Sequence, residues 1–220
     1  MLGIVCAMEK EIVHVLNLCT DITTEELHGI KVHKGKLGNT EVALIQSGVG
    51  KVAAAIATAV LCEQFPLKAV INVGIAGALS PSLSAFDCVL PDKLDQWDFD
   101  TTVFGDPRGF DLSERTCYAD ENLLKLMRSV LKNATVAPLV SGDQFVSTGE
   151  QKAIIHRYFP EAVACDMEGA AIAAAAAIHH VPFAALRTIS DSGNEMDYNE
   201  FCRIAAEKAA ECIARVAEQM

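Results

Sequence analysis

The chain has 220 residues, of which 51% are hydrophobic and 21% charged, and its formal net charge is −11 at pH 7. This composition is typical of a globular protein rather than a disordered or fibrous one. We expect one domain over residues 1–220, because no Ser-, Gly- or Pro-rich linker divides the chain. The acidic balance repels polyanions and leaves no basic patch, which excludes a nucleic-acid partner.

The eight cysteines form no C-x-x-C pair, and several lie in apolar runs as small buried residues do. We therefore expect neither a zinc site nor a disulfide framework. The first residues resemble no secretion signal, and no charge-free stretch reaches the ~18 residues of a membrane span. The sequence predicts a cytoplasmic protein without a membrane partner.

Short apolar or alternating runs bounded by turn residues predict strands. These are expected over 2–6, 30–36, 41–46, 69–73, 86–90, 162–165 and 183–189. Helical spacing predicts helices over 9–18, 51–64, 120–132, 149–158, 167–179 and 199–218. The alternation indicates an α/β fold of three layers, with a central mixed sheet covered by helices on both faces. Gly38-Asn39 predicts an antiparallel hairpin between the second and third strands.

Two glycine-rich segments resemble phosphate-binding loops without matching them. Residues 47–51 end in Gly-Lys, but Ile45 and Val52 replace the Gly and the Ser or Thr of a P-loop. Residues 72–78 contain Gly-x-x-Gly rather than the dinucleotide fingerprint. Both segments fit a tight strand-to-helix turn or a main chain that approaches a ligand, and the pattern alone does not choose between them.

Acidic residues follow three predicted strands. Glu11 comes after the first strand, Glu168 precedes the alanine-rich helix, and Asp191 follows the strand over 183–189. Each alone fits the first turn of a helix, but ligands bind where strands end in α/β sheets, so a shared cleft would bring all three together. These acids are not spaced as the ligands of a metal site are. His179 and His180 have no other potential metal ligand at such a spacing. Such carboxylates suit cleavage of a glycosidic bond, in which one acid protonates the leaving group and another carboxylate activates water.

Six separated motifs carry a more specific resemblance. They are residues 3–11, 47–51, 72–77, 141–146, 166–169 and 187–191. In this order, and over essentially the whole chain, they resemble the bacterial 5′-methylthioadenosine/S-adenosylhomocysteine nucleosidases of the purine nucleoside phosphorylase superfamily. The resemblance implies hydrolysis of the N-ribosidic bond of a small nucleoside, which releases adenine and a 5-thioribose, with no cofactor and no metal.

The resemblance also assigns catalytic roles by matched position. Asp191 would protonate N7 of adenine as the general acid, with Ser190 helping to orient it, and Glu11 would activate the attacking water. Glu168 would accept hydrogen bonds from the ribose hydroxyls. Because Asp191 must carry a proton when it acts, we expect its pKa to be raised.

Binding residues follow from the same resemblance. Phe145 would stack on the purine, the main chain of Val146 would read its edge, Met167 would pack under the ribose, and Arg187 would lie near the water and the 2′-hydroxyl. Three further sets are implied: Met8, Val49 and Phe201 in the thioalkyl pocket; Ile75, Ala76 and Gly77 along the substrate; and Phe104, contributed by the partner subunit of a homodimer. At Ile75 some relatives carry a hydroxyl residue, so one support for the water is lost here.

Three alternatives stay open at this point. A phosphorylase would need cations for phosphate, whereas the chain has no Arg before Arg108 and Glu11 would repel the anion. A non-catalytic adenosine-binding protein would not need both an acid and a water activator. Some relatives act instead on an aminofutalosine nucleoside, whose larger 5′ group would enter the same pocket.

Overall fold

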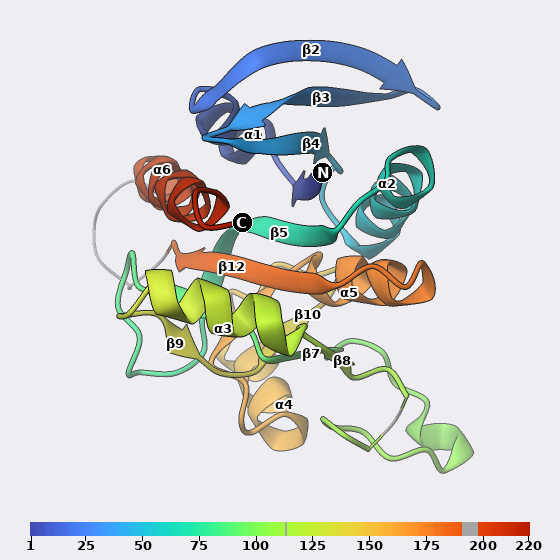
Figure 1. The fold of residues 1–220 in the computed structure, drawn as a ribbon. Coiled ribbons are helices and arrows are strands. Elements are labelled where there is room, and N and C mark those ends of the chain that lie inside the picture. Colours follow the sequence, from blue (N-terminus) through green and yellow to red (C-terminus); the bar gives the residue numbers. More distant parts are fainter. Residues whose placement is uncertain (113, 191–197) are drawn as a thin grey trace.

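The computed structural model describes residues 1–112, 114–190 and 198–220 (Figure 1). In its first third, strands and helices follow one another closely. They are β1 (Leu2–Cys6), α1 (Glu9–Leu16), β2 (Cys19–Leu27), β3 (Ile30–Leu37), β4 (Thr40–Gln46), α2 (Lys51–Gln64) and β5 (Ala69–Ala78). The antiparallel pairing of β3 with β4 confirms the hairpin predicted around Gly38.

The remaining elements are shorter on average. They are β6 (Cys88–Leu90), β7 (Lys93–Gln96), a 3₁₀ turn (Thr102–Phe104), β8 (Cys117–Tyr118), α3 (Glu121–Val130), β9 (Thr135–Val136), β10 (Leu139–Ser141), α4 (Gly149–Tyr158), β11 (Ala164–Asp166), α5 (Gly169–Ile178), β12 (Phe183–Ile189) and α6 (Tyr198–Ala217). None of the described helices is long and apolar enough to cross a membrane.

Strand β5 is the centre of the sheet, which has twelve strands in the described part of the chain. Its first half pairs in parallel with β1, and β12 runs parallel to it as far as Ala76. Its last residues, Gly77 and Ala78, pair antiparallel with β11. The sheet is therefore mixed, and the ends of β1, β11 and β12 converge around the second half of β5.

Helices cover both faces of the sheet, as the alternating pattern predicted (Figure 1). Along β1, Leu2 and Ile4 point to one face, where they join a buried cluster with residues of α1, α3 and α6. Val5 points to the other face and packs in a cluster with the alanines of α2 and α5. Because a strand alternates its side chains, one apolar strand supplies both cores.

Of the two alternatives left open for residues 72–78, the strand-to-helix turn is wrong, because this segment continues β5 to Ala78. Pairing with β12 and then β11 satisfies its backbone groups, and small residues allow both neighbours to approach. The other glycine-rich segment, 47–51, does connect a strand to a helix, from β4 to α2. Among the described strands, β2 and β7–β10 were not predicted: β2 is a mostly exposed edge strand with a polar sequence, and the others are very short.

Candidate active site

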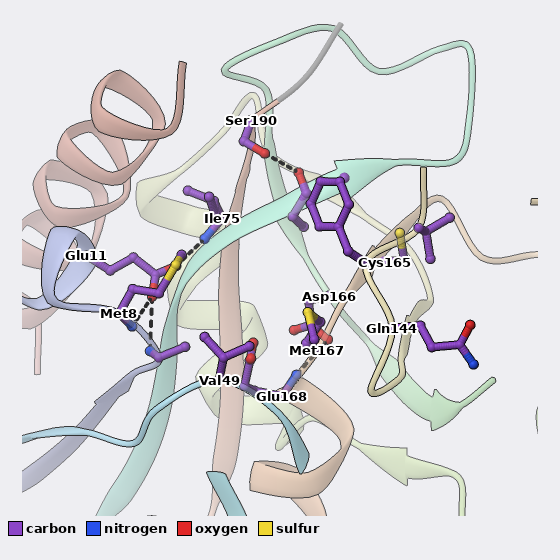
Figure 2. A pocket seen from close by; sticks show the side chains of 15 residues that line it. Met8, Glu11, Val49, Ile75, Gln144, Cys165, Asp166, Met167, Glu168 and Ser190 are labelled. Carbon is purple, nitrogen blue, oxygen red and sulfur yellow. Dashed lines mark hydrogen bonds between the residues drawn. The ribbon is translucent and has the colours of Figure 1, made fainter. Parts of the chain in front are cut away.

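A cavity of about 230 Å³ opens where β1, β5, β11 and β12 end (Figure 2). Eleven residues proposed from the sequence line it: Met8, Glu11, Val49, Ile75, Ala76, Gly77, Phe145, Val146, Met167, Glu168 and Ser190. They come from separate elements that the sheet topology brings to one place. The cavity is therefore the candidate active site.

Glu11 is a buried acid whose carboxylate is fixed by main-chain donors. Its Oε2 accepts the N–H groups of Ala7 (3.0 Å) and Met8 (2.9 Å) in its own turn, and Oε1 accepts the N–H of Ile75 in β5 (3.0 Å). Burial raises the pKa of Glu11, while Arg187 and the three N–H groups act in the opposite direction. The result is a held carboxylate whose affinity for a proton is above its ordinary value, as a general base requires.

Gly74 lets β5 pass close to this carboxylate. A Cβ atom at this position would lie 2.5 Å from Oε1 of Glu11 and 2.9 Å from Nη1 of Arg187. Contacts that short are not tolerated, so any larger residue would displace one of the two side chains. The glycine thus sets the relative positions of the acid and the guanidinium.

Arg187 and Asp166 form a buried ion pair beside the cavity. Nε of Arg187 donates to Oδ2 of Asp166 at 2.9 Å and Nη2 donates to the same oxygen at 2.5 Å, and Nη2 also donates to the side chain of Asn72. Asp166 further accepts the hydroxyl of Ser141 and the N–H of Gly169. Burial lowers the pKa of Arg187, but its acidic neighbours outweigh this and hold it above the ordinary value. The guanidinium stays charged and balances the acids around it.

Glu168 is the second acid that faces the cavity. Its Oε1 accepts the N–H of Gly50 at 2.9 Å, which connects the start of α5 to the turn before α2. Burial, with the charge of Asp166 adding to it, raises the pKa of Glu168 to about 7, against the opposing effect of Arg187. This carboxyl therefore changes its charge near neutral pH.

The turn before α2 is held by Lys51. Its ammonium group donates to Asp98 at 2.6 Å and to Gln96 at 3.0 Å, and its N–H donates to Asp143 at 2.7 Å. Gly50 has a φ of 98°, and a Cβ there would lie 3.1 Å from Oδ1 of Asp143. The lysine that made this segment resemble a P-loop thus has a structural partner, and the turn carries Val49 to the cavity wall.

The rest of the wall is mostly apolar. Met8, Val49 and Met167 border the cavity (Figure 2). Phe145 also borders it, with 60% of its surface exposed. Ser190 closes the end of β12, where its N–H donates to the carbonyl of Ala76 at 3.0 Å. An apolar wall with a few fixed polar groups is typical of a site for a small molecule.

Four other residues proposed from the sequence do not line the cavity or lie outside the described residues. Arg187 lies behind Gly74, with Asp166 and Asn72 as its partners. Phe201 is buried in α6 and stacks on Phe86, with ring centroids 5.3 Å apart. Phe104 is 82% exposed, and Asp191 falls outside the residues that the structure describes.

Sequence reasoning missed four lining residues: Ala7, Gln144, Cys165 and Asp166. Asp166 stands in one of the recognised motifs, two residues before Glu168, but no role was assigned to it. Asp166 pairs with Arg187 of a different strand, and the spacing of residues in the sequence does not indicate this pair. Among the described residues, no group of three His, Cys, Asp or Glu is arranged to hold a metal ion.

Comparison with known proteins places this arrangement in a family. The model of the phosphorylase superfamily matches residues 1–218. The chain belongs to this superfamily. A curated member, the 5′-methylthioadenosine/S-adenosylhomocysteine nucleosidase of Staphylococcus haemolyticus, is 38% identical over 97% of each chain. The fold is also that of this superfamily, with its central mixed sheet between helices.

Two solved structures of superfamily members cover essentially the whole chain. The 5′-methylthioadenosine/S-adenosylhomocysteine nucleosidase of Neisseria meningitidis, in complex with methylthio-immucillin-A, matches with a TM-score of 0.91 and 31% identity over 100% of this chain and 99% of that one. The futalosine hydrolase of Helicobacter pylori matches with a TM-score of 0.92 and 31% identity over 100% and 97%. The superfamily fold thus carries more than one nucleoside specificity.

Proposed function

We propose that this protein is a nucleosidase that hydrolyses the N-ribosidic bond of 5′-methylthioadenosine and S-adenosylhomocysteine. The products are adenine and the corresponding 5-thioribose. The observation that carries the proposal is the buried carboxylate of Glu11, held by three N–H groups at one wall of the cavity. The curated relatives with the name of this enzyme, 36–38% identical over 96–100% of the chain, support it.

The reaction needs positive charge to form on the ribose as the bond to adenine breaks. Glu11 takes a proton from water that attacks the anomeric carbon, and Glu168 accepts hydrogen bonds from the ribose hydroxyls. Nearby carboxylates stabilise the ribose cation because they are already fixed before the charge develops. The acidic wall of the cavity supports this division of roles.

Adenine leaves readily only when a ring nitrogen is protonated. We assign this step to Asp191, the residue after Ser190 in the sequence, with the proton delivered to N7. Phe145 stacks on the purine and Val146 presents its main chain to the edge of the ring. Met8 and Val49 line the part of the cavity that takes the thioalkyl group, where soft apolar side chains suit sulfur.

Water is preferred to phosphate as the nucleophile on grounds of charge. Of the described residues that line the cavity, none is Lys or Arg, whereas Glu11, Asp166 and Glu168 are acids. Arg187 is the nearby cation, and Asp166 neutralises it. A phosphate ion would therefore meet net negative charge.

The experiment is chromatographic identification of the products after incubation of the purified protein with each nucleoside. The proposal predicts stoichiometric adenine and a free thioribose from both. Binding of the nucleosides without adenine release would support a non-catalytic adenosine-binding protein instead. The wild-type protein is compared with Asp191→Asn, which we expect to retain binding and lose turnover.

A second candidate substrate is an aminofutalosine nucleoside, because a futalosine hydrolase shares the fold over the whole chain. The part of the cavity that would hold the 5′ group of the nucleoside, next to Met8 and Val49, decides between the two substrates. Comparison of kcat/KM for nucleosides with small and bulky 5′ groups separates them. We expect the methylthio compound to be preferred, and a large preference for the bulky group would reverse the assignment.

The protein is further proposed to act as a cytoplasmic homodimer. Support comes from exposed apolar side chains near the cavity mouth and on the neighbouring helix, namely Val49, Val52, Ile56 and Phe145. Phe104, also exposed, would close the partner's pocket. An exposed apolar surface of this kind is typical of an interface between subunits, and the free cysteines are typical of a reducing compartment.

A further inference from the structure

A second cavity, of about 540 Å³, lies between α6, the start of β6 and the turn from α3 to β9. It shares no lining residue with the candidate active site. Three cations border it, Lys132, Lys208 and Arg215, together with one acid, Asp87. The proposed nucleosidase reaction uses none of these residues.

Two cysteines from distant parts of the sequence meet at this cavity. Cys88 belongs to β6 and Cys212 to α6, both line the cavity, and Cys88 packs against the apolar cluster that contains Cys212. Cys88 is fixed by the pairing of β6 with β12, and Cys212 is 7% exposed within the apolar cluster beneath α6. Regular secondary structure on both sides thus holds the two cysteines at the same cavity.

The pKa values of the two thiols shift in opposite directions. Lys208 and Arg215 lie four residues before and three residues after Cys212, so all three share one face of α6. The neighbouring thiol of Cys88 lowers the pKa of Cys212 to about 7, with help from Arg215 and Lys208 and against burial and Glu211. The neighbouring thiol of Cys212, burial and the nearby Asp87 raise the pKa of Cys88 well above its ordinary value, although Lys208 opposes this. Lys132, on the α3–β9 turn, adds positive charge across the cavity.

Four of the other thiols lack this environment. Burial raises the pKa of Cys19 and of Cys62 to about 11, and it also raises the pKa of Cys6 and Cys117. A thiolate reacts with oxidants and a thiol does so only slowly. Cys212, which borders an open cavity, is therefore the favoured nucleophile.

We propose that Cys212 and Cys88 form an oxidation site that takes a small peroxide and closes as a disulfide between α6 and β6. In the first step the thiolate of Cys212 attacks hydrogen peroxide, the S–O bond forms as the O–O bond breaks, and hydroxide leaves. In the second step the sulfur of Cys88 displaces the hydroxyl group from the sulfenic acid, and the thiol proton of Cys88 leaves with it as water.

The overall reaction is balanced. Two thiols lose two electrons and two protons, and one peroxide is reduced to two water molecules. The role of each cysteine is distinct, because Cys212 attacks and Cys88 resolves. The lysine and arginine neighbours stabilise the thiolate before attack, and the neutral peroxide needs no charged subsite.

Mass spectrometry tests the proposal directly. The reduced protein is treated with one equivalent of hydrogen peroxide, its remaining thiols are alkylated, and it is cleaved with trypsin. Cleavage after Lys68, Lys93, Lys208 and Arg215 gives the peptides 69–93 and 209–215, each with one cysteine. We expect these two peptides to be joined by the first disulfide that forms, within one chain.

Two variants complete the experiment. In Cys88→Ser we expect no cross-link, and a sulfenic acid at Cys212 that dimedone traps. In Cys62→Ser, the matched control, the cross-link between 69–93 and 209–215 should form as in the wild type. The proposal is overturned if both peptides are recovered fully alkylated while other cysteines oxidise, or if the first disulfide joins other residues or two chains.

Discussion

The carboxylate of Glu11 accepts a hydrogen bond from the backbone N–H of Ile75, sixty-four residues further along the chain, at 3.0 Å. This contact connects the first helix to the central strand and fixes one oxygen of the acid. The other oxygen is fixed by Ala7 and Met8. Glu11, the proposed water activator, has three donors on its carboxylate and so needs no reorganisation when the reaction begins.

Glu11→Gln should reduce kcat by about 10²- to 10⁴-fold. The amide keeps the size of the side chain but cannot take a proton from water, and its NH₂ group faces backbone donors. KM should change little because the substrate-binding walls remain. Steady-state kinetics of adenine release measures both constants. The matched control is Glu9→Gln, an exposed acid of the same helix, and equal losses in the two variants would contradict the role of Glu11.

Gly74→Ala should lower kcat/KM by at least about tenfold and destabilise the fold by about 1–3 kcal/mol. The added methyl group would lie 2.5 Å from the Glu11 carboxylate and 2.9 Å from Arg187, so at least one of them must move. Kinetics and thermal unfolding check the two effects. Gly149→Ala is the control, since a Cβ there meets no atom within 4 Å. Wild-type activity in Gly74→Ala would show that the position of the acid is not critical.

Removal of Arg187 should be strongly destabilising. Arg187→Met leaves Asp166 buried without its ion-pair partner, which costs about 3–5 kcal/mol when one member of a buried pair is lost. Denaturant unfolding measures this cost. Arg203→Met, in an exposed pair with Glu207, should change stability by less than about 0.5 kcal/mol. Similar effects of the two substitutions would mean that the Asp166 pair contributes no more than a surface contact.

The stability of the fold should depend on pH through Glu168. Its pKa is about 7 in the folded protein, above the ordinary value of 4.5, so the unfolded chain loses this proton first. The contribution of Glu168 to the free energy of unfolding is therefore largest below pH ~4.5. It decreases as the pH rises to about 7 and is constant above that pH.

Glu168→Gln should remove this dependence. Relative to wild type, the variant should gain as much as about 3 kcal/mol of stability between pH 4.5 and pH 8, since each pKa unit corresponds to about 1.4 kcal/mol. Denaturant unfolding at a series of pH values checks this, with the exposed Glu63→Gln as control. Parallel stability curves for wild type and Glu168→Gln would show that burial does not raise this pKa.

Phe104→Ala should raise KM for 5′-methylthioadenosine by at least about tenfold, equivalent to ~1.4 kcal/mol of binding. The reason is the proposed contribution of Phe104 to the pocket of a partner subunit. Light scattering gives the oligomeric state, and Ile178→Ala, which removes another exposed apolar side chain, is the control. A monomeric wild-type protein, or an unchanged KM, would refute the shared pocket.

Local signals in the sequence predicted much of the fold. The helices over 51–64 and 149–158 and the strand over 183–189 have the observed bounds, because helical spacing and an apolar run mark them in the sequence. The edge strand β2 was missed since its polar residues are stabilised by pairing with β3 rather than by burial. The continuation of β5 was missed because its glycines are explained only by neighbours that approach from distant segments.

The candidate site, like the fold, could be predicted from the sequence only in part. Acids at strand ends, with the recognised motifs, were enough to identify Glu11 and Glu168 as neighbours of one cavity. The partners that fix them were not predictable: Ile75 and Gly50 contribute backbone N–H groups, which any residue but proline carries. The ion pair between Asp166 and Arg187 depends on the pairing of strands far apart in sequence, so only the fold reveals it.

The most direct test of the central claim is the dependence of turnover on phosphate. The purified protein is incubated with 5′-methylthioadenosine, with and without phosphate, and the sugar product is examined by ³¹P nuclear magnetic resonance and chromatography. We predict the same rate of adenine release in both, with an unphosphorylated thioribose as product. Turnover only with phosphate, with formation of the sugar 1-phosphate, would contradict hydrolysis and make the protein a phosphorylase.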